Sequence, residues 1–218
     1  MICEKCEMRM TKNGFIKSNG KQRFSCTCCG VSRIEKYDNK ACQIGISDSI
    51  VLLLKEGCGT LSIARLLQIS PTTVTKRILQ IASMIKKPIV AFGKEYEMDE
   101  LITFVGSKKN RICIAYAIDR TTKQVIDFVV GKRNKTNLGK VVNTLLLSAA
   151  KVIRTDKLNH YLGLIPKHLH IVKQRGTNYI ERKNLTLRTH IKRLNRRSIA
   201  YSKSQLVLQA ILTIYFWF

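Results

Sequence analysis

The stretch that decides the fold reads Thr177-Asn178-Tyr179-Ile180-Glu181-Arg182-Lys183-Asn184-Leu185-Thr186-Leu187-Arg188-Thr189-His190-Ile191-Lys192-Arg193-Leu194-Asn195-Arg196-Arg197-Ser198. It holds a single acid, Glu181, among many cations. From residue 130 to the last residue there are 18 Lys and Arg but only two acids, Asp156 and Glu181. The lone carboxylate can attract a divalent metal ion, while the surrounding Lys and Arg side chains attract a polyanion. A metal-dependent enzyme acting on nucleic-acid phosphates requires this combination. The alternative is a capping or salt-bridged Glu on a basic surface helix.

Helical spacing within this stretch separates two faces. An apolar stripe recurs at offsets of seven, four and three residues: Ile180, Leu187, Ile191 and Leu194. A neighbouring polar stripe holds Glu181, Asn184 and Arg188. Thr177 or Asn178 is a suitable cap, so the pattern predicts Glu181 in or near the first helical turn, where a carboxylate is favoured.

The chain is strongly basic along its whole length. Its 218 residues carry a net charge of +25 with 45% hydrophobic residues, enough for a core and one or two domains plus a small module. The charge favours double-stranded DNA as partner over a membrane surface, since no amphipathic anchor is visible. No signal peptide is recognisable, and residues 206–218 are too short to span a bilayer, so we expect a buried terminal helix and a cytoplasmic, nucleoid-associated protein.

The first 40 residues contain two CxxC pairs separated by 19 residues, Cys3/Cys6 and Cys26/Cys29. This spacing is typical of a zinc ribbon, in which four thiolates bind one structural Zn²⁺ and leave no open position for catalysis. Cys28 is left over. The alternative is two redox-active or unligated pairs. We therefore predict a zinc ribbon over residues 1–40.

Residues 41–88 are predicted to form a helix-turn-helix domain. Ser47 or Asp48 is expected to cap a first helix, and Gly57 and Gly59 separate it from a second. Ser70 caps a third helix that starts at Pro71. Its outward positions suit DNA bases and phosphates: Thr72, Thr73, Lys76 and Arg77. The alternative is an ordinary three-helix packing unit.

Residues 89–218 alternate between strand and helix patterns. Strands are expected at 96–105, 112–118, 124–130, 151–155 and 168–172, with an Asn137-capped helix through Ala150 after the third. Three antiparallel strands, a helix, two short strands and a helix give an α/β domain in the ribonuclease-H-like order.

In that order three distant acids, Asp99, Asp156 and Glu181, converge. Their oxygens suit two Mg²⁺ or Mn²⁺ ions that activate an attacking oxygen and stabilise a leaving one. Glu97 and Glu100 are competing acids, because a slip of strand register would exchange Glu97 for Asp99. We expect two further acids to be solvated, Asp119 and Asp127.

The segment Asp99-Glu100-Leu101-Ile102-Thr103-Phe104-Val105-Gly106, together with residues 180–194 and the tail Ser198-Ile199-Ala200-Tyr201-Ser202-Lys203-Ser204, resembles transposases of the insertion-sequence-one (IS1) family. The resemblance extends over essentially the whole chain. It implies a DDE triad of Asp99, Asp156 and Glu181, with 24 residues between the last two. It also implies that Arg188 holds a DNA phosphate near the metals.

The resemblance further implies binding to the terminal inverted repeats of an element, strand cleavage and strand transfer into target DNA, with at least a dimer in action. The basic residues after Glu181 then contact DNA, although they could be a solvated face: Lys192, Arg193, Arg196 and Arg197. Two rival functions are a non-catalytic DNA-binding regulator and a ribonuclease-H-like nuclease without strand transfer.

Overall fold

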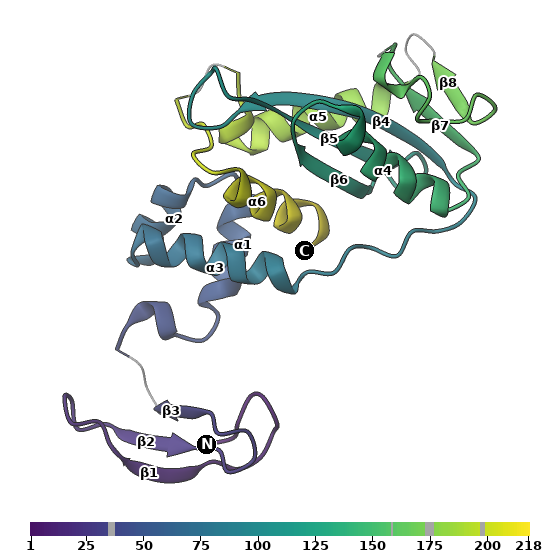
Figure 1. Cartoon of the computed structure of the whole chain (residues 1–218). Helices are drawn as coiled ribbons and strands as arrows, with labels where there is room; N and C mark the ends of the chain where they lie inside the picture. The colour runs from purple at the N-terminus through teal and green to yellow at the C-terminus, as the bar shows by residue number, and fades with distance from the viewer. Residues whose placement is uncertain (35–37, 158, 173–176, 197–198) are drawn as a thin grey trace. The chain divides into compact units, whose positions relative to one another are not determined.

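The computed structural model describes residues 1–34, 38–157, 159–172, 177–196 and 199–218 (Figure 1). Arg197, one of the expected DNA contacts, lies outside these residues. The chain divides into two compact units, Met1–Ile46 and Ser47–Phe218. No helix in the described part of the chain is both long and apolar enough to cross a membrane.

The first unit is a small ribbon built around the cysteines. Its antiparallel sheet has the order β1 (Thr11–Phe15), β2 (Gln22–Ser25) and β3 (Ser32–Ile34). Each CxxC pair sits in a tight turn that ends on a residue in the left-handed region, Glu7 (φ 56°) or Gly30 (φ 71°). The N–H of that residue donates to the carbonyl of the first cysteine of its pair. The two turns therefore present their thiols in the same way.

Three helices open the second unit: α1 (Ile46–Lys55), α2 (Thr60–Leu67) and α3 (Pro71–Met84). The turn between α2 and α3 spans three residues and begins at Gln68 in the left-handed region. Ser70 caps α3 as predicted, since its hydroxyl accepts from the N–H of Thr73. Helix α1 begins at Ile46, slightly before the predicted caps. The pair α2–α3 has the helix-turn-helix form.

The rest of the second unit is a five-stranded mixed sheet. Its strands are β4 (Glu95–Phe104), β5 (Arg111–Asp119), β6 (Val125–Gly131), β7 (Val152–Thr155) and β8 (His170–Val172), in the spatial order β6-β5-β4-β7-β8. The first three are antiparallel, whereas β7 runs parallel to β4 and β8 parallel to β7. This is the ribonuclease-H-like topology, and the predicted α/β fold class is confirmed.

Helices cover both faces of the sheet (Figure 1). Helix α4 (Lys135–Leu147) packs on one face through Leu138, Val141 and Leu145. Helices α5 (Asn178–His190) and α6 (Gln205–Trp217) pack on the other, with Ile180, Leu187 and Leu212 in a common core. Helix α6 also contacts α3, so it is buried on two sides, which explains its nearly continuous apolar sequence.

Both predicted boundaries of the helix after the third strand of the sheet were wrong. Helix α4 is capped by Asn134, whose side-chain oxygen accepts from the N–H of Asn137, and it ends at Leu147. Helix α5 ends at His190, although the apolar stripe continues. Ile191 and Leu194 are buried as the stripe predicts, but a short 3-10 turn, Lys192–Leu194, carries them into the core.

Candidate active site

The first two acids of the predicted triad meet where β4 and β7 part. The parallel register pairs Glu95 with Val152 and Glu97 with Arg154, so its continuation sets Asp99 opposite Asp156. One carboxylate oxygen from each of Asp99, Glu100 and Asp156 lies within 4.8 Å of the other two. The structure thus brings Asp99 and Asp156 together and adds Glu100.

Asp99 is held by a chain of hydrogen bonds that starts in the core. The hydroxyl of the buried Tyr116 donates to Oδ1 of Asn184 at 2.8 Å, and Nδ2 of Asn184 donates to Oδ2 of Asp99 at 2.6 Å. Oδ1 of Asp99 accepts from the N–H of Glu100 at 2.7 Å. Burial, and then the charges of Glu100 and Asp156, raise the pKa of Asp99 to about 6. A carboxyl in this position gains from a nearby cation.

Glu100 enters the cluster from the opposite face of β4. Its Oε2 accepts from Arg133 at 3.0 Å, and its Oε1 accepts from the hydroxyl of Tyr161. Burial and the charge of Glu100 raise the pKa of Tyr161, so this phenol stays a donor. Sequence reasoning counted Glu100 only as a competing acid. The sequence signal for a role of Glu100 in the cluster was its position next to Asp99, just after the part of β4 that pairs with β7.

Glu97 has a structural role. It is fully buried, and its Oε2 accepts from the N–H groups of Tyr179 and Ile180 at 3.1 and 3.0 Å, which caps the start of α5. Its Oε1 pairs with Arg120 at 3.0 Å. Both carboxylate oxygens are thus engaged by the protein, and the exchange of Glu97 for Asp99 that a register slip would cause does not occur.

The expectation that Asp119 and Asp127 are solvated was wrong, since both are buried. Asp119 accepts from the N–H groups of Thr121 and Thr122 and so closes the turn after β5. Asp127 pairs with Lys87 at 2.7 Å and accepts from Thr144. Both acids can be buried because donors compensate them, from the adjacent turn for Asp119 and from Lys87 and Thr144, distant in sequence, for Asp127.

Glu181 lies in the first turn of α5 as predicted, but it is not among the described acids that form the cluster. It is exposed, and its Oε1 accepts from the hydroxyl of Thr177 at 3.0 Å. It stands one turn, about 4.5 Å along the helix axis, from Asn184, which contacts Asp99.

The flank of α5 that carries Glu181 follows from helix geometry. Tyr179 contacts Arg120 and Lys123 in the turn after β5. Two residues further on, the helix has rotated by about 200°, so Glu181 faces the opposite flank. Because α5 packs on β4, whose other neighbour is β7, that flank is the side of Asp156.

Arg188 is engaged within the fold. It donates to the carbonyl of Leu194 at 2.9 Å and so stabilises the turn after α5. Burial, and then the charge of Arg196, lower its pKa. Of the other predicted DNA contacts in this region, Lys192 and Arg196 are exposed and Arg193 is partly buried. In α3, Thr72 and Lys76 are exposed, whereas Thr73 and Arg77 are partly buried.

The four cysteines of the first unit form a separate cluster. The Sγ atoms of Cys3 and Cys29 are 3.5 Å apart, and Cys6 lies 3.3 Å from Cys26 and 3.7 Å from Cys29. Four sulfurs at about 2.3 Å from a tetrahedral zinc would be about 3.8 Å apart, so the donor set and spacing fit the ion. Backbone N–H donation from Cys29, and then the hydrogen bond with Cys6, lower the pKa of Cys26 to about 6, whereas the same hydrogen bond raises the pKa of Cys6. Cys28 is exposed and outside the cluster.

The second unit thus combines a ribonuclease-H-like sheet with an acid cluster, Asp99, Glu100 and Asp156, at the β4–β7 junction. The profile of the IS1 transposase family matches residues 94–217, more than half of the chain. The chain belongs to the IS1 transposase family, which confirms the resemblance drawn from its sequence.

Individual IS1 proteins are also similar in sequence to this chain. Insertion element IS1 2 protein InsB of Escherichia coli (strain K12) is 38% identical over 108 residues, which cover 50% of this chain and 65% of that protein. Insertion element IS1 protein InsB of Shigella sonnei is 37% identical over 108 residues, 50% of this chain and 82% of the relative. The matched part of this chain thus spans about two thirds of the length of the Escherichia coli relative.

Two solved structures are also similar to the chain. The HTLV-2 integrase catalytic core domain matches with 14% identity and a TM-score of 0.39, over 58% of this chain and 87% of that one. A chain of the simian T-cell lymphotropic virus intasome in complex with PP2A regulatory subunit B56 gamma matches with 12% identity and a TM-score of 0.40, over 76% and 67%.

Proposed function

We propose that this chain is a DNA transposase that cleaves and joins DNA strands with Mg²⁺ or Mn²⁺. The observation that carries the proposal is the meeting of Asp99 and Asp156 at the β4–β7 junction, with Glu100 in the same cluster, beneath the helix that bears Glu181. Carboxylate oxygens are the ligands that Mg²⁺ prefers, and bound there it would activate an attacking oxygen and stabilise the leaving one.

Asp99, Asp156 and Glu181 are the proposed catalytic ligands. Asp99 is oriented by Asn184, and Glu181 occupies the flank of α5 on the side of Asp156. For Glu181 to join them, its side chain leaves the hydroxyl of Thr177 and turns toward the cluster. This contact is partly buried and made by one hydroxyl, so it costs about 1 kcal/mol to break, which metal binding would offset.

We assign three functional regions, with the boundaries 1–40, 41–88 and 89–218. The zinc ribbon and the helix-turn-helix bind the terminal inverted repeats, the latter through Thr72, Thr73, Lys76 and Arg77. Lys192, Arg193, Arg196 and Arg197 hold phosphates beside the cleavage site, and Arg188 joins them once it is released from Leu194. The active form pairs two DNA ends and is at least a dimer, acting on DNA in a bacterial cytoplasm.

The test is incubation of labelled element ends with Mg²⁺, comparing the native chain with Glu181→Gln. We expect the native chain to nick the ends and to join pre-cut ends to target DNA, while the variant binds the ends but does neither. Glu7→Gln, an exposed acid in the first unit, is the matched control and should cleave normally. Full cleavage by Glu181→Gln would refute the proposal.

The same assay separates the rivals. A non-catalytic regulator predicts binding without any metal-dependent nicking. A nuclease predicts nicking without joined products from pre-cut ends.

A further inference from the structure

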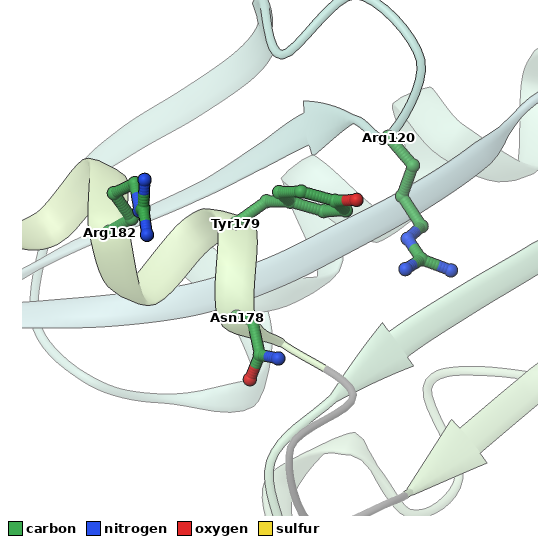
Figure 2. Close-up of a pocket in the computed structure, with 4 residues that line it drawn as sticks. All are labelled: Arg120, Asn178, Tyr179 and Arg182. Carbon is green, nitrogen blue, oxygen red and sulfur yellow. The ribbon is translucent and has the colours of Figure 1, made fainter.

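A pocket of about 350 Å³ lies beside the start of α5, on the flank away from Glu181. Figure 2 shows its lining residues, Arg120, Asn178, Tyr179 and Arg182, with the ring of Tyr179 between the two arginines. Tyr179 is 43% exposed, although a large aromatic side chain gains from burial. The pocket belongs neither to the acid cluster nor to the cysteine cluster.

Cations surround this ring. The ammonium of Lys123 lies 2.9 Å from the ring centroid of Tyr179, and the guanidinium of Arg120 lies 5.4 Å from it. Arg182 is exposed one turn further along the helix. An aromatic face next to several cations offers both stacking and phosphate binding, the two interactions by which proteins hold single-stranded nucleic acid.

The pocket is also prearranged. Glu97 and Glu95 hold Arg120 at 3.0 and 3.3 Å, and Glu95 also pairs with Arg154 at 3.0 Å. These two acids pair with Arg120 and Arg154, and Lys123 and Arg182 add two further cations around Tyr179, so the surroundings remain net positive. The Tyr179 backbone is fixed by its N–H bond to Glu97, which no change of its side chain removes.

We propose that this pocket holds an unpaired nucleotide of the bound DNA, with its base stacked on Tyr179 and its phosphate on Arg182. The inference rests on the proposed function for the identity of the polymer. A helix is about 10–12 Å wide, so the pocket is about three base steps from the Glu181 flank. The pocket would therefore bind the strand about three nucleotides from the point of cleavage. The end of the duplex must open locally for a nucleotide to enter the pocket.

The probe is a hairpin duplex with a three-nucleotide single-stranded tail that contains 2-aminopurine, compared with the blunt hairpin. Binding is measured by anisotropy at 0.2 M salt without divalent ions, so that no cleavage occurs. For the native chain we expect tighter binding of the tailed hairpin and quenched 2-aminopurine emission. Tyr179→Ala should lower the tailed-to-blunt affinity ratio by about tenfold and abolish the quenching.

Three further variants define the interaction. Tyr179→Phe keeps the ring and should preserve both the ratio and the quenching. Arg182→Gln should weaken the tailed hairpin more than the blunt one, because it removes a contact to the phosphate of the unpaired nucleotide. Leu185→Ala removes an exposed side chain of the same helix, outside the pocket, and should change nothing. Thermal unfolding of each variant verifies that it folds.

An unchanged affinity ratio and unchanged quenching in a folded Tyr179→Ala would overturn the inference, as would an equal loss for both hairpins. This outcome is independent of the proposed chemistry. If Glu181→Gln still cleaves, the transposase proposal fails while the binding result stands. If the native chain cleaves but Tyr179→Ala binds tails normally, only the pocket inference fails.

Discussion

The raised pKa of Asp99 predicts that this proposed metal ligand destabilises the metal-free fold. An ordinary Asp has a pKa of 3.8, and burial beside Glu100 and Asp156 raises it to about 6. A shift of about two units corresponds to about 3 kcal/mol at pH 8. Asp99→Asn removes this electrostatic cost. It also places the amide group of the new side chain against the Nδ2 donor of Asn184, and the loss of that hydrogen bond costs about 1 kcal/mol. We expect a net stabilisation of about 2 kcal/mol.

The sign of the pH dependence follows from the direction of the shift. Because the pKa is raised in the folded state, the folded protein binds this proton more tightly than the unfolded chain. The Asp99 contribution to native stability therefore falls as pH rises from about 4 to about 6 and stays constant above that window. The advantage of Asp99→Asn should appear over the same window and vanish below it.

Urea unfolding followed by tryptophan fluorescence measures this effect. The chain has a single Trp, Trp217, which packs against Phe128 and donates to the carbonyl of Val125, so its emission reports on the sheet. With a slope of about 2 kcal/mol per molar urea, the midpoint should rise by about 1 M at pH 8 after dialysis into Mg²⁺-free buffer. Added Mg²⁺ should stabilise the native chain more than the variant.

Asp48→Asn is the control, because Asp48 is exposed in the first turn of α1 and should change stability by less than about 0.5 kcal/mol. An Asp99→Asn midpoint at or below that of the native chain at pH 8 would refute the reasoning. It would mean that the hydrogen bonds to Asp99 outweigh the electrostatic cost of its charge.

Three other predictions follow from single contacts. Zinc removal, or Cys26→Ser, should unfold the ribbon and leave the Trp217 emission unchanged, whereas Cys28→Ser should retain one zinc per chain by metal analysis. Gly57→Ala should lower stability by at least about 2 kcal/mol in thermal unfolding, because φ is +78° and a Cβ would lie 2.3 Å from the carbonyl oxygen of His190. Gly59→Ala, with open space around it, should cost about 1 kcal/mol or less, and equal losses for the two would contradict this. Glu97→Gln should cost about 3 kcal/mol, since it leaves Arg120 without its buried partner and weakens the cap of α5; a loss below about 0.5 kcal/mol in urea would show that the cap is dispensable.

The sequence was sufficient where a local pattern has one physical solution. The double CxxC spacing led to a cluster because four thiols at those intervals fit one ion. Ser70 before Pro71 marked the start of α3, since both residues favour that position. The run of apolar strands separated by turns gave the sheet order, because few topologies obey the connection rules.

The sequence was insufficient where two residues suit the same position, or where a contact depends on a residue far away in the chain. Asn134 and Asn137 can each cap a helix, and the choice depends on the loop, in which Nδ2 of Asn137 donates to the carbonyl of Lys132. The burial of Asp127 depends on Lys87, forty residues away. Glu100 joined the cluster because Arg133 and Tyr161 hold it, and neither partner is close in sequence. Such partners become visible only in three dimensions.

The relation between β4 and α5 shows why the position of Glu181 is nevertheless well determined. Glu97 contacts the N–H groups of Tyr179 and Ile180, and Asp99 contacts Asn184. Two strand residues span about 6.8 Å, and four to five helical residues span about 6–7.5 Å, so both contacts form only when strand and helix run in the same direction. A slip of one residue along the helix would break the cap and the contact with Asp99 together. The backbone of Glu181 is therefore fixed along the helix axis between these two contacts, and its proposed role as a metal ligand requires only that its side chain leave Thr177.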